Sequence, residues 1–259
     1  QFATDATVSK LYSNSDYWVL DNILTFQKNF NDMHQLSVMV GTSSEETRSE
    51  QTAASRQGLV NNSEQQRILN AASMNPAASG WKAESAMQSY FSRVFYSYMN
   101  KYLFTANIRR DGSSNFGKGR KWGTFPSFSL GWNFSEENFM SRFDNLSQGK
   151  MRVSGGKIGN QAIGGGAYLS TYTGNWGYYL YGSSFTPQLL GGNNNMGNPN
   201  VQWETTEQLD IGLDLGFFNN SLTLNVDYFV KTTDDMLLQV PMHTYLGFPN
   251  NSWVNEGSI

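Results

Sequence analysis

The chain has 259 residues with no cysteine, two histidines, 18 basic and 21 acidic side chains, and therefore a formal net charge of −3. These numbers exclude a disulfide framework and a cysteine-based zinc site, and the charge balance lacks the basic excess of a nucleic-acid-binding surface. A mean hydropathy of −0.48 without an apolar run near roughly 18 residues excludes a transmembrane helix, but not a membrane barrel, whose alternating strands average to a polar value.

Both ends of the chain lack terminal signals. It opens QFATDATVSK, without an initiator Met, a basic n-region or an apolar h-region, so no signal peptide is expected. It closes VNEGSI, which is typical of a strand that begins rather than of a domain that finishes. We expect an interior piece of a longer protein.

Alternation of apolar and polar residues, the mark of a strand with one buried face, begins in the N-terminal region. One parity of the first predicted strand is apolar, at Trp18, Leu20, Leu24 and Phe26. A turn at Asn31-Asp32 precedes a second strand, whose apolar residues are Leu36, Val38 and Val40. A long polar loop is expected over 45–84, with a helix that begins at the capping-box sequence Ser63–Gln66.

A second long hairpin is predicted over SYFSRVFYSYMNKYLFTANIRRDGSS, with its turn near Asn100. In its second arm Tyr102, Phe104, Ala106 and Ile108 alternate with Thr105, Asn107 and Arg109. A loop over 112–124 follows, and a third pair of strands is predicted over 125–134 and 150–158. After another long loop, over 159–204, the alternation is clearest in EQLDIGLDLGFF and SLTLNVDYFVK, which the short turn Asn219-Asn220 joins.

The pattern therefore predicts an all-β chain of about eight antiparallel strands, many of them longer than the usual strand of roughly 5–6 residues. Connections near residues 31, 100 and 219 are short, whereas those at 45–84, 112–124 and 159–204 are long. Short turns at one end and long loops at the other are typical of an outer-membrane barrel. Periodicity alone leaves a soluble, aromatic-rich sandwich open.

Three stretches resemble the middle of the barrel in the SusC/RagA family of TonB-dependent outer-membrane transporters. They are YSYMNKYLFTANIRRDGSSNFGKGRKWGTFPSFSLGWNFSEE (96–137), GKMRVSGGKIGNQ (149–161) and GNPNVQWETTEQLDIGLDLGFFNNSLTLNVDYFVKTTDDMLLQV (197–240). Their order and spacing also match, and YWVLDNILTFQKNF…HQLSVMVG fits the preceding hairpin.

The resemblance implies that residues 1–259 form part of one transmembrane β-barrel domain of roughly 22 strands, with the plug and the N-terminal extension outside this sequence. It implies location in the outer membrane of a Bacteroidetes-type Gram-negative bacterium, long extracellular loops and energy supplied through TonB. A SusD-like surface lipoprotein would be the partner, and oligosaccharides or peptides the cargo. A passive porin and a soluble carbohydrate-binding sandwich remain the alternatives.

Within such a barrel, the two parities of each strand receive different roles. The residues expected to face lipid are Leu209, Ile211, Leu213, Leu222, Leu224 and Val226. The residues expected to face the lumen are Asn107, Arg109, Asp210, Asp214, Asn225 and Asp227. Tyr and Trp near strand ends suit the aromatic girdle at a membrane interface.

Motifs with catalytic potential are weak. Arg109 and Arg110 could clamp a carboxylate, but the following Asp-Gly-Ser-Ser is turn chemistry and favours arginines that pair across strands or face the lumen. Gly155–Gly159 lacks the spacing of a phosphate-binding loop. His34 and His243 are isolated from other ligands. We therefore predict no catalytic residue, cofactor or metal, and no enzyme.

The loop 159–204 is the strongest candidate for contact with a substrate or partner. Its aromatic residues, spaced by Gly and Asn, could stack on sugar rings or cover a protein surface, or could pack among neighbouring loops. Those singled out are Tyr172, Trp176, Tyr178, Tyr179 and Tyr181, together with Tyr168.

Overall fold

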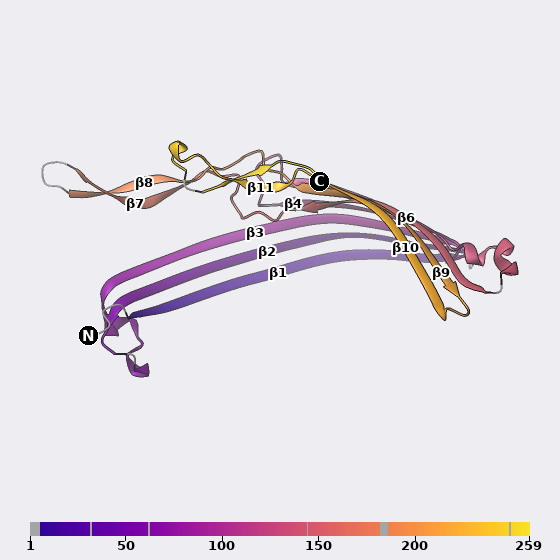
Figure 1. Ribbon diagram of the computed structural model, residues 1–259, viewed down its shortest axis with the longest axis horizontal. Helices are drawn as coiled ribbons and strands as arrows, with labels where there is room; N and C mark the ends of the chain where they lie inside the picture. The colour runs from indigo at the N-terminus through magenta and orange to yellow at the C-terminus, as the bar shows by residue number, and fades with distance from the viewer. Residues whose placement is uncertain (1–5, 32, 62, 144, 182–185, 249) are drawn as a thin grey trace. The chain divides into compact units, whose positions relative to one another are not determined.

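An eight-stranded sheet, in the order β1-β2-β3-β4-β5-β6-β9-β10, dominates the computed structural model (Figure 1). The structure describes residues 6–31, 33–61, 63–143, 145–181, 186–248 and 250–259. The strands of the sheet are β1 (Thr7–Phe30), β2 (His34–Leu59), β3 (Ala72–Tyr98), β4 (Tyr102–Ser113), β5 (Trp122–Trp132), β6 (Leu146–Asn160), β9 (Glu204–Phe217) and β10 (Leu222–Asp234). The predicted all-β antiparallel fold and its eight strands are confirmed.

Two compact units divide the chain. Gln1–Val19 and Glu45–Ala86 form the first unit, and Leu20–Ser44 and Met87–Ile259 form the second. Within the described ranges, no helix is long and apolar enough to cross a membrane.

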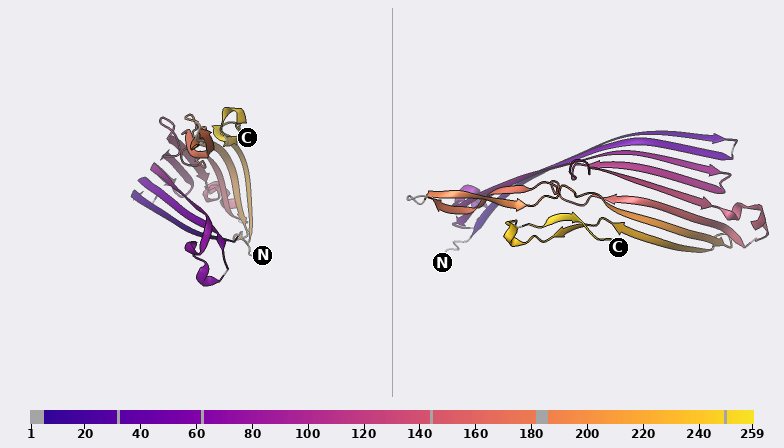
Figure 2. Two further views of the ribbon diagram at one scale, coloured as in Figure 1. Left: turned by 90° about the vertical axis from the view of Figure 1, so that its left-hand side faces the viewer. Right: turned by 90° about the horizontal axis from the view of Figure 1, so that it is seen from above.

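Short connections join successive strands at one end of the second unit's sheet, as the right-hand panel of Figure 2 shows. Met99 and Asn100 adopt φ values of 51° and 56° between β3 and β4, and Asn219 and Asn220 adopt 53° and 60° between β9 and β10. Asparagine tolerates this left-handed region better than most residues, because its short polar side chain bonds to the local backbone. The turns predicted at Asn100 and Asn219-Asn220 are confirmed.

The expected loop over 45–84 is wrong. Strand β2 continues to Leu59 and β3 begins at Ala72, so only the residues between them connect the two strands. That connection holds two 3-10 helices of three residues each, η1 (Glu64–Gln66) and η2 (Leu69–Ala71). Ser63 precedes η1 but its side chain makes no capping hydrogen bond, so the predicted capped helix is also absent from these residues.

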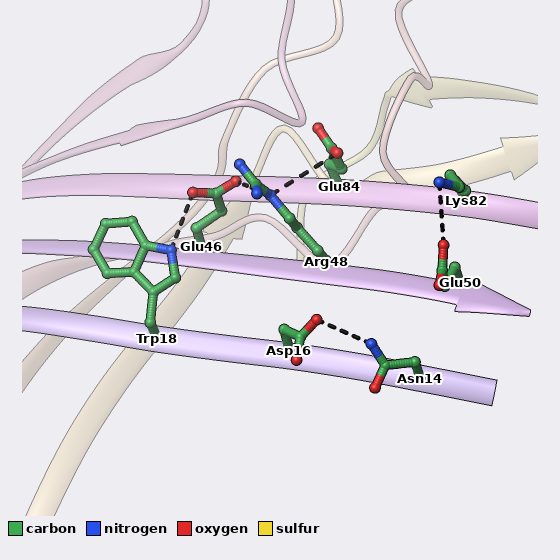
Figure 3. Close-up of polar contacts among 8 residues, drawn as sticks. All are labelled: Asn14, Asp16, Trp18, Glu46, Arg48, Glu50, Lys82 and Glu84. Atoms are coloured by element: carbon green, nitrogen blue, oxygen red, sulfur yellow. Dashed lines mark hydrogen bonds and ion pairs between the residues drawn. The ribbon is translucent and has the colours of Figure 1, made fainter.

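Polar cross-strand contacts explain why the first unit's strands carry no alternation of apolar residues (Figure 3). The Trp18 indole donates to Glu46 at 3.1 Å, and Arg48 lies 2.6 Å from the Glu46 carboxylate. Lys82 on β3 pairs with Glu50 on β2 at 3.1 Å. Pairs of this kind bring β1, β2 and β3 together without an apolar face, and hydrophobic periodicity cannot detect such strands.

The long connection between β6 and β9 contains a β-hairpin of its own. Strands β7 (Thr171–Tyr181) and β8 (Thr186–Asn195) pair with each other and form a separate two-stranded sheet (Figure 1). Beyond β10, β11 (Leu237–Val240) and β12 (Ser252–Asn255) form another. The expected loop 159–204 is therefore partly strand, whereas the expected loop 112–124 contains the true connection between Ser113 and Trp122.

Two 3-10 helices lie in the connection between β5 and β6, at the end of the sheet where the short turns are. They are η3 (Phe134–Glu136) and η4 (Asn138–Arg142). Between them, Glu137 accepts hydrogen bonds from the Tyr102 hydroxyl at 2.6 Å and the Lys101 ammonium at 3.1 Å. These donors, the Tyr102 hydroxyl first, hold the pKa of Glu137 below its ordinary value. The carboxylate therefore ties the start of β4 and the turn before it to the connection between β5 and β6.

The ladder between β5 and β6 ends halfway along both strands. It pairs Trp132 with Met151 at one end and Ser127 with Gly156 at the other. The next residue of β5 is Pro126, which has no N–H to donate. Beyond it, β5 stays paired with β4 and β6 stays paired with β9, so the sheet opens between β5 and β6.

A small apolar core lies beside this opening. The Phe125 ring meets the Trp203 ring edge-on at a centroid distance of 5.4 Å, and Phe116 contacts Trp203 at 5.2 Å. The Trp203 indole donates to the Lys121 carbonyl at 2.9 Å. Residues of this core that are buried are Phe116, Phe125, Ile163, Ala167, Val201 and Trp203. The core joins β5 to the β4–β5 connection and to the long connection between β6 and β9.

A side chain at Gly159 should disrupt this core. A Cβ built at Gly159 overlaps the Phe125 ring, whereas one built at Gly164 meets nothing within 4 Å. Gly159→Ala in the full-length protein is expected to lower the free energy of unfolding by about 1–3 kcal/mol, because the ring must move. Gly164→Ala is the matched control and should leave it unchanged. Equal urea-unfolding midpoints for the two variants in detergent micelles would contradict this packing.

Candidate functional site: the polar face of the sheet

The pairing register separates polar from apolar side chains across β4 to β10. Asn107 lies opposite Ser127 on β5, Asp214 lies opposite Asn225, and Leu213 lies opposite Val226. Since successive residues of a strand point to opposite faces, two faces can be followed across the sheet. The polar face carries Asn107, Arg109, Asp210, Asp214, Asn225 and Asp227. The apolar face carries Leu209, Ile211, Leu213, Leu222, Leu224 and Val226.

Each predicted set therefore shares one face, and the two sets lie on opposite faces. The assignment of the apolar face to lipid and of the polar face to the lumen stays a prediction at this point.

Arg152 joins three strands on the polar face. Its guanidinium bonds both carboxylate oxygens of Asp214, at 2.8 and 3.0 Å, and an oxygen of Asp227 at 2.8 Å. Gly212 lies between Arg152 and Asp227 in the register, and a Cβ there would fall 2.7 Å from the Arg152 Cζ. The glycine thus leaves the space that the guanidinium fills. Sequence reasoning found both aspartates and missed Arg152, because only the register places it between them.

A second polar cluster on the same face lies near the C-terminal end of β4. Arg109 donates from Nε to both oxygens of Asp111, at 2.8 and 2.9 Å, and from Nη2 to Ser89 at 2.9 Å. Its guanidinium also lies 5.6 Å from the centre of the Phe91 ring. Asp111 is buried within β4, so the turn expected at Asp111 is wrong: the carboxylate neutralises Arg109 instead.

A cavity of about 570 Å³ opens beside this cluster on the polar face. Arg93 and Asn107 form part of its wall, where Arg93 donates to Asn107 at 2.8 Å and Asn107 donates to Ser127 at 3.2 Å. Phe91, Phe125 and Ile158 contribute apolar surface. The cavity therefore offers cationic, amide and aromatic groups side by side, which suits a ligand with both carboxylate and apolar parts.

The apolar face ends in aromatic residues. Tyr98 and Tyr102 stack with ring centres 6.3 Å apart near the short turns. At the opposite end of β4, Tyr90 stacks on Trp122 at 5.9 Å, and the Arg110 guanidinium lies 5.3 Å from the Trp122 ring centre. Amphipathic rings at both ends of an apolar band are typical of strands that cross a membrane.

The aromatic residues predicted to make contacts lie on or near β7. Tyr172 is 75% exposed. The backbones of Trp176, Tyr178, Tyr179 and Tyr181 belong to β7, but their side chains fall outside the described part of the structure. Tyr168 instead packs against the core that contains Trp203.

The histidines contact aromatic residues. His34 Nδ1 lies 2.6 Å from the Tyr96 hydroxyl, and His243 stacks on Tyr245 at 5.4 Å. Among the residues that the structure describes, no cluster of three His, Cys, Asp or Glu side chains could hold a metal ion.

Sequence comparisons relate the chain to outer-membrane receptors. The family model described as "TonB dependent receptor-like, beta-barrel" matches residues 1–259. TonB-dependent receptor P39 of Formosa agariphila is 38% identical over 240 residues, which cover 92% of this chain and 22% of that protein. TonB-dependent receptor SusC of Bacteroides thetaiotaomicron is 38% identical over 186 residues, or 69% of this chain and 18% of that protein. The chain thus spans about a fifth of the length of these relatives.

Structural comparison agrees. The RagAB peptide transporter superposes with a TM-score of 0.84 at 26% identity, over 96% of this chain and 27% of that one. The siderophore receptor PirA of Acinetobacter baumannii superposes with a TM-score of 0.54 at 12% identity, over 95% of this chain and 33% of that one, and shows a shared fold alone.

Loss of Arg152 should destabilise the sheet. Arg152→Gln leaves two carboxylates close together without their shared cation, so the free energy of unfolding should fall by about 1.5–3 kcal/mol, the range for hydrogen bonds to charged groups. Adding Asp214→Asn and Asp227→Asn should recover most of the loss, because no charge is then unpaired. Urea unfolding of the full-length protein in micelles measures both effects. A triple variant as unstable as the single one would argue against a charge origin.

Proposed function

Because the chain belongs to the TonB-dependent receptor-like β-barrel family, we propose that the full-length protein is an active importer that moves oligosaccharides or peptides across the outer membrane. Membership places the chain in the outer membrane of a Bacteroidetes-type bacterium, in a family of transporters rather than enzymes. Energy would come through TonB, by a region outside this chain.

One observation carries the proposal: an eight-stranded antiparallel sheet whose faces divide into apolar and polar sets, matched over its whole length by the receptor-barrel family. A soluble sandwich would require another sheet against the apolar face. A passive porin would share the two faces but would need no energy source.

The cavity on the polar face favours peptides as the first cargo class to test. Arg93 can receive a carboxylate, and Phe91 and Phe125 can receive an apolar side chain. The structurally similar RagAB complex is a peptide transporter. Aromatic faces also stack on sugars, so oligosaccharides stay in the proposal as the second class.

A SusD-like lipoprotein is the proposed partner. Strands β7 and β8 form a hairpin outside the main sheet, rich in aromatic residues and glycine, and Tyr172 is largely exposed. Such a hairpin has the composition of a contact surface, since tyrosine and tryptophan supply large area at low entropic cost. We assign the hairpin to contact with the lipoprotein or the cargo.

Uptake measurements test the function. Cells that express the full-length protein should accumulate labelled peptides or oligosaccharides, and collapse of the proton gradient should abolish accumulation. Trp176→Ala with Tyr178→Ala should lower uptake or co-purification of the lipoprotein, while the amount of folded barrel stays unchanged. Uptake that persists without the gradient would indicate a porin. Unaltered uptake and assembly in the double variant would remove the hairpin from the proposal.

Charged substitutions test which face meets lipid. Leu213→Lys and Val226→Lys should each cost about 2–4 kcal/mol of folding free energy if the residue lies near the bilayer midplane. Asn225→Lys, on the neighbouring position of β10 but the polar face, is the matched control and should cost far less. Folding yield into lipid vesicles reports the difference. Equal tolerance at Leu213 and Asn225 would reverse the assignment of the faces.

A further inference from the structure

The apolar face is hollowed where β4, β5, β6, β9 and β10 run side by side. A groove of about 840 Å³ lies there, bordered by Pro126, Phe128, Leu209 and Val230. Phe128, Leu209 and Val230 are each about half exposed. The groove is thus apolar at these positions and open to the surroundings of the face.

Small residues in a row of large ones create this hollow. The register aligns Ala106 with Phe128, Phe128 with Gly155, Gly155 with Leu209 and Leu209 with Val230. The Phe128 ring leans over Gly155, where a Cβ would lie 3.1 Å from it. The ring therefore turns toward β6, and Ala106 leaves the space beside it unfilled.

The end of the groove farther from the short turns is polar. Lys157 and Glu207 form an ion pair at 3.0 Å and both line the groove. On β4, Arg110 shares the apolar face with Ala106 and lies over the Trp122 ring. Among the described residues, no carboxylate forms an ion pair with Arg110.

The charge around this end differs from that of the whole chain. Residues 108–124 contain five cationic side chains and one carboxylate, although the chain has a net charge of −3. The carboxylate, Asp111, is buried and already bonded to Arg109. The region around β4 and β5 therefore attracts anions.

We propose that the groove binds an acylated, phosphorylated lipid of the outer leaflet, of the lipid A type. An acyl chain lies against Ala106, Phe128 and Leu209, and a headgroup phosphate meets the guanidinium of Arg110. Arginine suits this role because its planar fork matches phosphate oxygens and also stacks on indole. Lys157 supplies a second donor, with Glu207 fixing its position.

Trp122 holds Arg110 in place for this contact. A Cβ at Gly112 would fall 2.8 Å from the Trp122 ring, so the glycine allows the indole to lie flat across β4. Tyr90 stacks on the same indole, and its hydroxyl is a further donor at headgroup level. Three aromatic and cationic side chains thus converge at this end of the apolar face.

The inference rests on the proposed assignment of the apolar face to lipid. Its test uses the full-length protein, purified in mild detergent and added to phosphorylated or dephosphorylated lipid A, with native mass spectrometry to count bound lipid. The wild type should retain one phosphorylated lipid A and bind the dephosphorylated form about tenfold more weakly. Inorganic phosphate alone should not displace the lipid, because the acyl contact is then missing.

Two variants separate the groove from the phosphate contact. Ala106→Leu fills the groove and should reduce retention of both lipid forms, whereas Val226→Leu, on the same face outside the groove, should not. Arg110→Gln should abolish the preference for the phosphorylated form, whereas Arg93→Gln, on the polar face, should preserve it. Equal retention in Ala106→Leu and Val226→Leu, or a second copy of the chain in place of lipid, would overturn the proposal.

Uptake measurements distinguish a failure of the proposed lipid site from a failure of the proposed transport function. Ala106→Leu should leave energy-dependent uptake unchanged, because the groove lies on the face opposite the cavity. If the wild-type protein retains lipid but shows no energy-dependent uptake, that result would contradict only the proposed transport function. Tolerance of Leu213→Lys would instead remove the membrane assignment on which the lipid site depends.

Discussion

The hydrogen-bond register between neighbouring strands determines most of what this sheet presents to its surroundings. A slip by one residue would exchange the faces of every side chain on a strand, because the side-chain period is two. The observed register places Leu213 against Val226 and Asp214 against Asn225. It also brings Arg152 between Asp214 and Asp227, so that one guanidinium bridges β6, β9 and β10 on the polar face.

The interruption of that register matters as much as its continuity. Pro126 lies where the β5–β6 ladder ends, and Gly155, Gly156 and Gly159 leave space for the neighbouring Phe128, Ser127 and Phe125 side chains. On one face the opening adjoins the cavity with Arg93 and Phe125, and on the other it adjoins the proposed lipid groove. Lys157 lines both hollows. Both hollows thus adjoin the same break in pairing.

Sequence reasoning located the eight strands of the main sheet but misjudged how far three of them extend. Apolar alternation marks the parts of β1, β2 and β3 near the short turns, and it disappears where Glu46, Arg48 and Glu50 pair with polar neighbours. Strands β7 and β8 were missed for a related reason, because a run rich in Gly, Asn and Tyr resembles a loop. Periodicity detects a strand only when its faces differ in polarity.

The sequence by itself determined the fold class, the short turns at asparagine and the division of residues into a polar and an apolar set, since each depends on local chemistry or on a period of two. The tertiary structure decided which members of those sets meet. Arg152 with its aspartates, Arg109 with the buried Asp111 and Phe125 against Trp203 each join distant strands or connections. Such contacts require the register of several strands at once, and no single stretch of sequence contains that information.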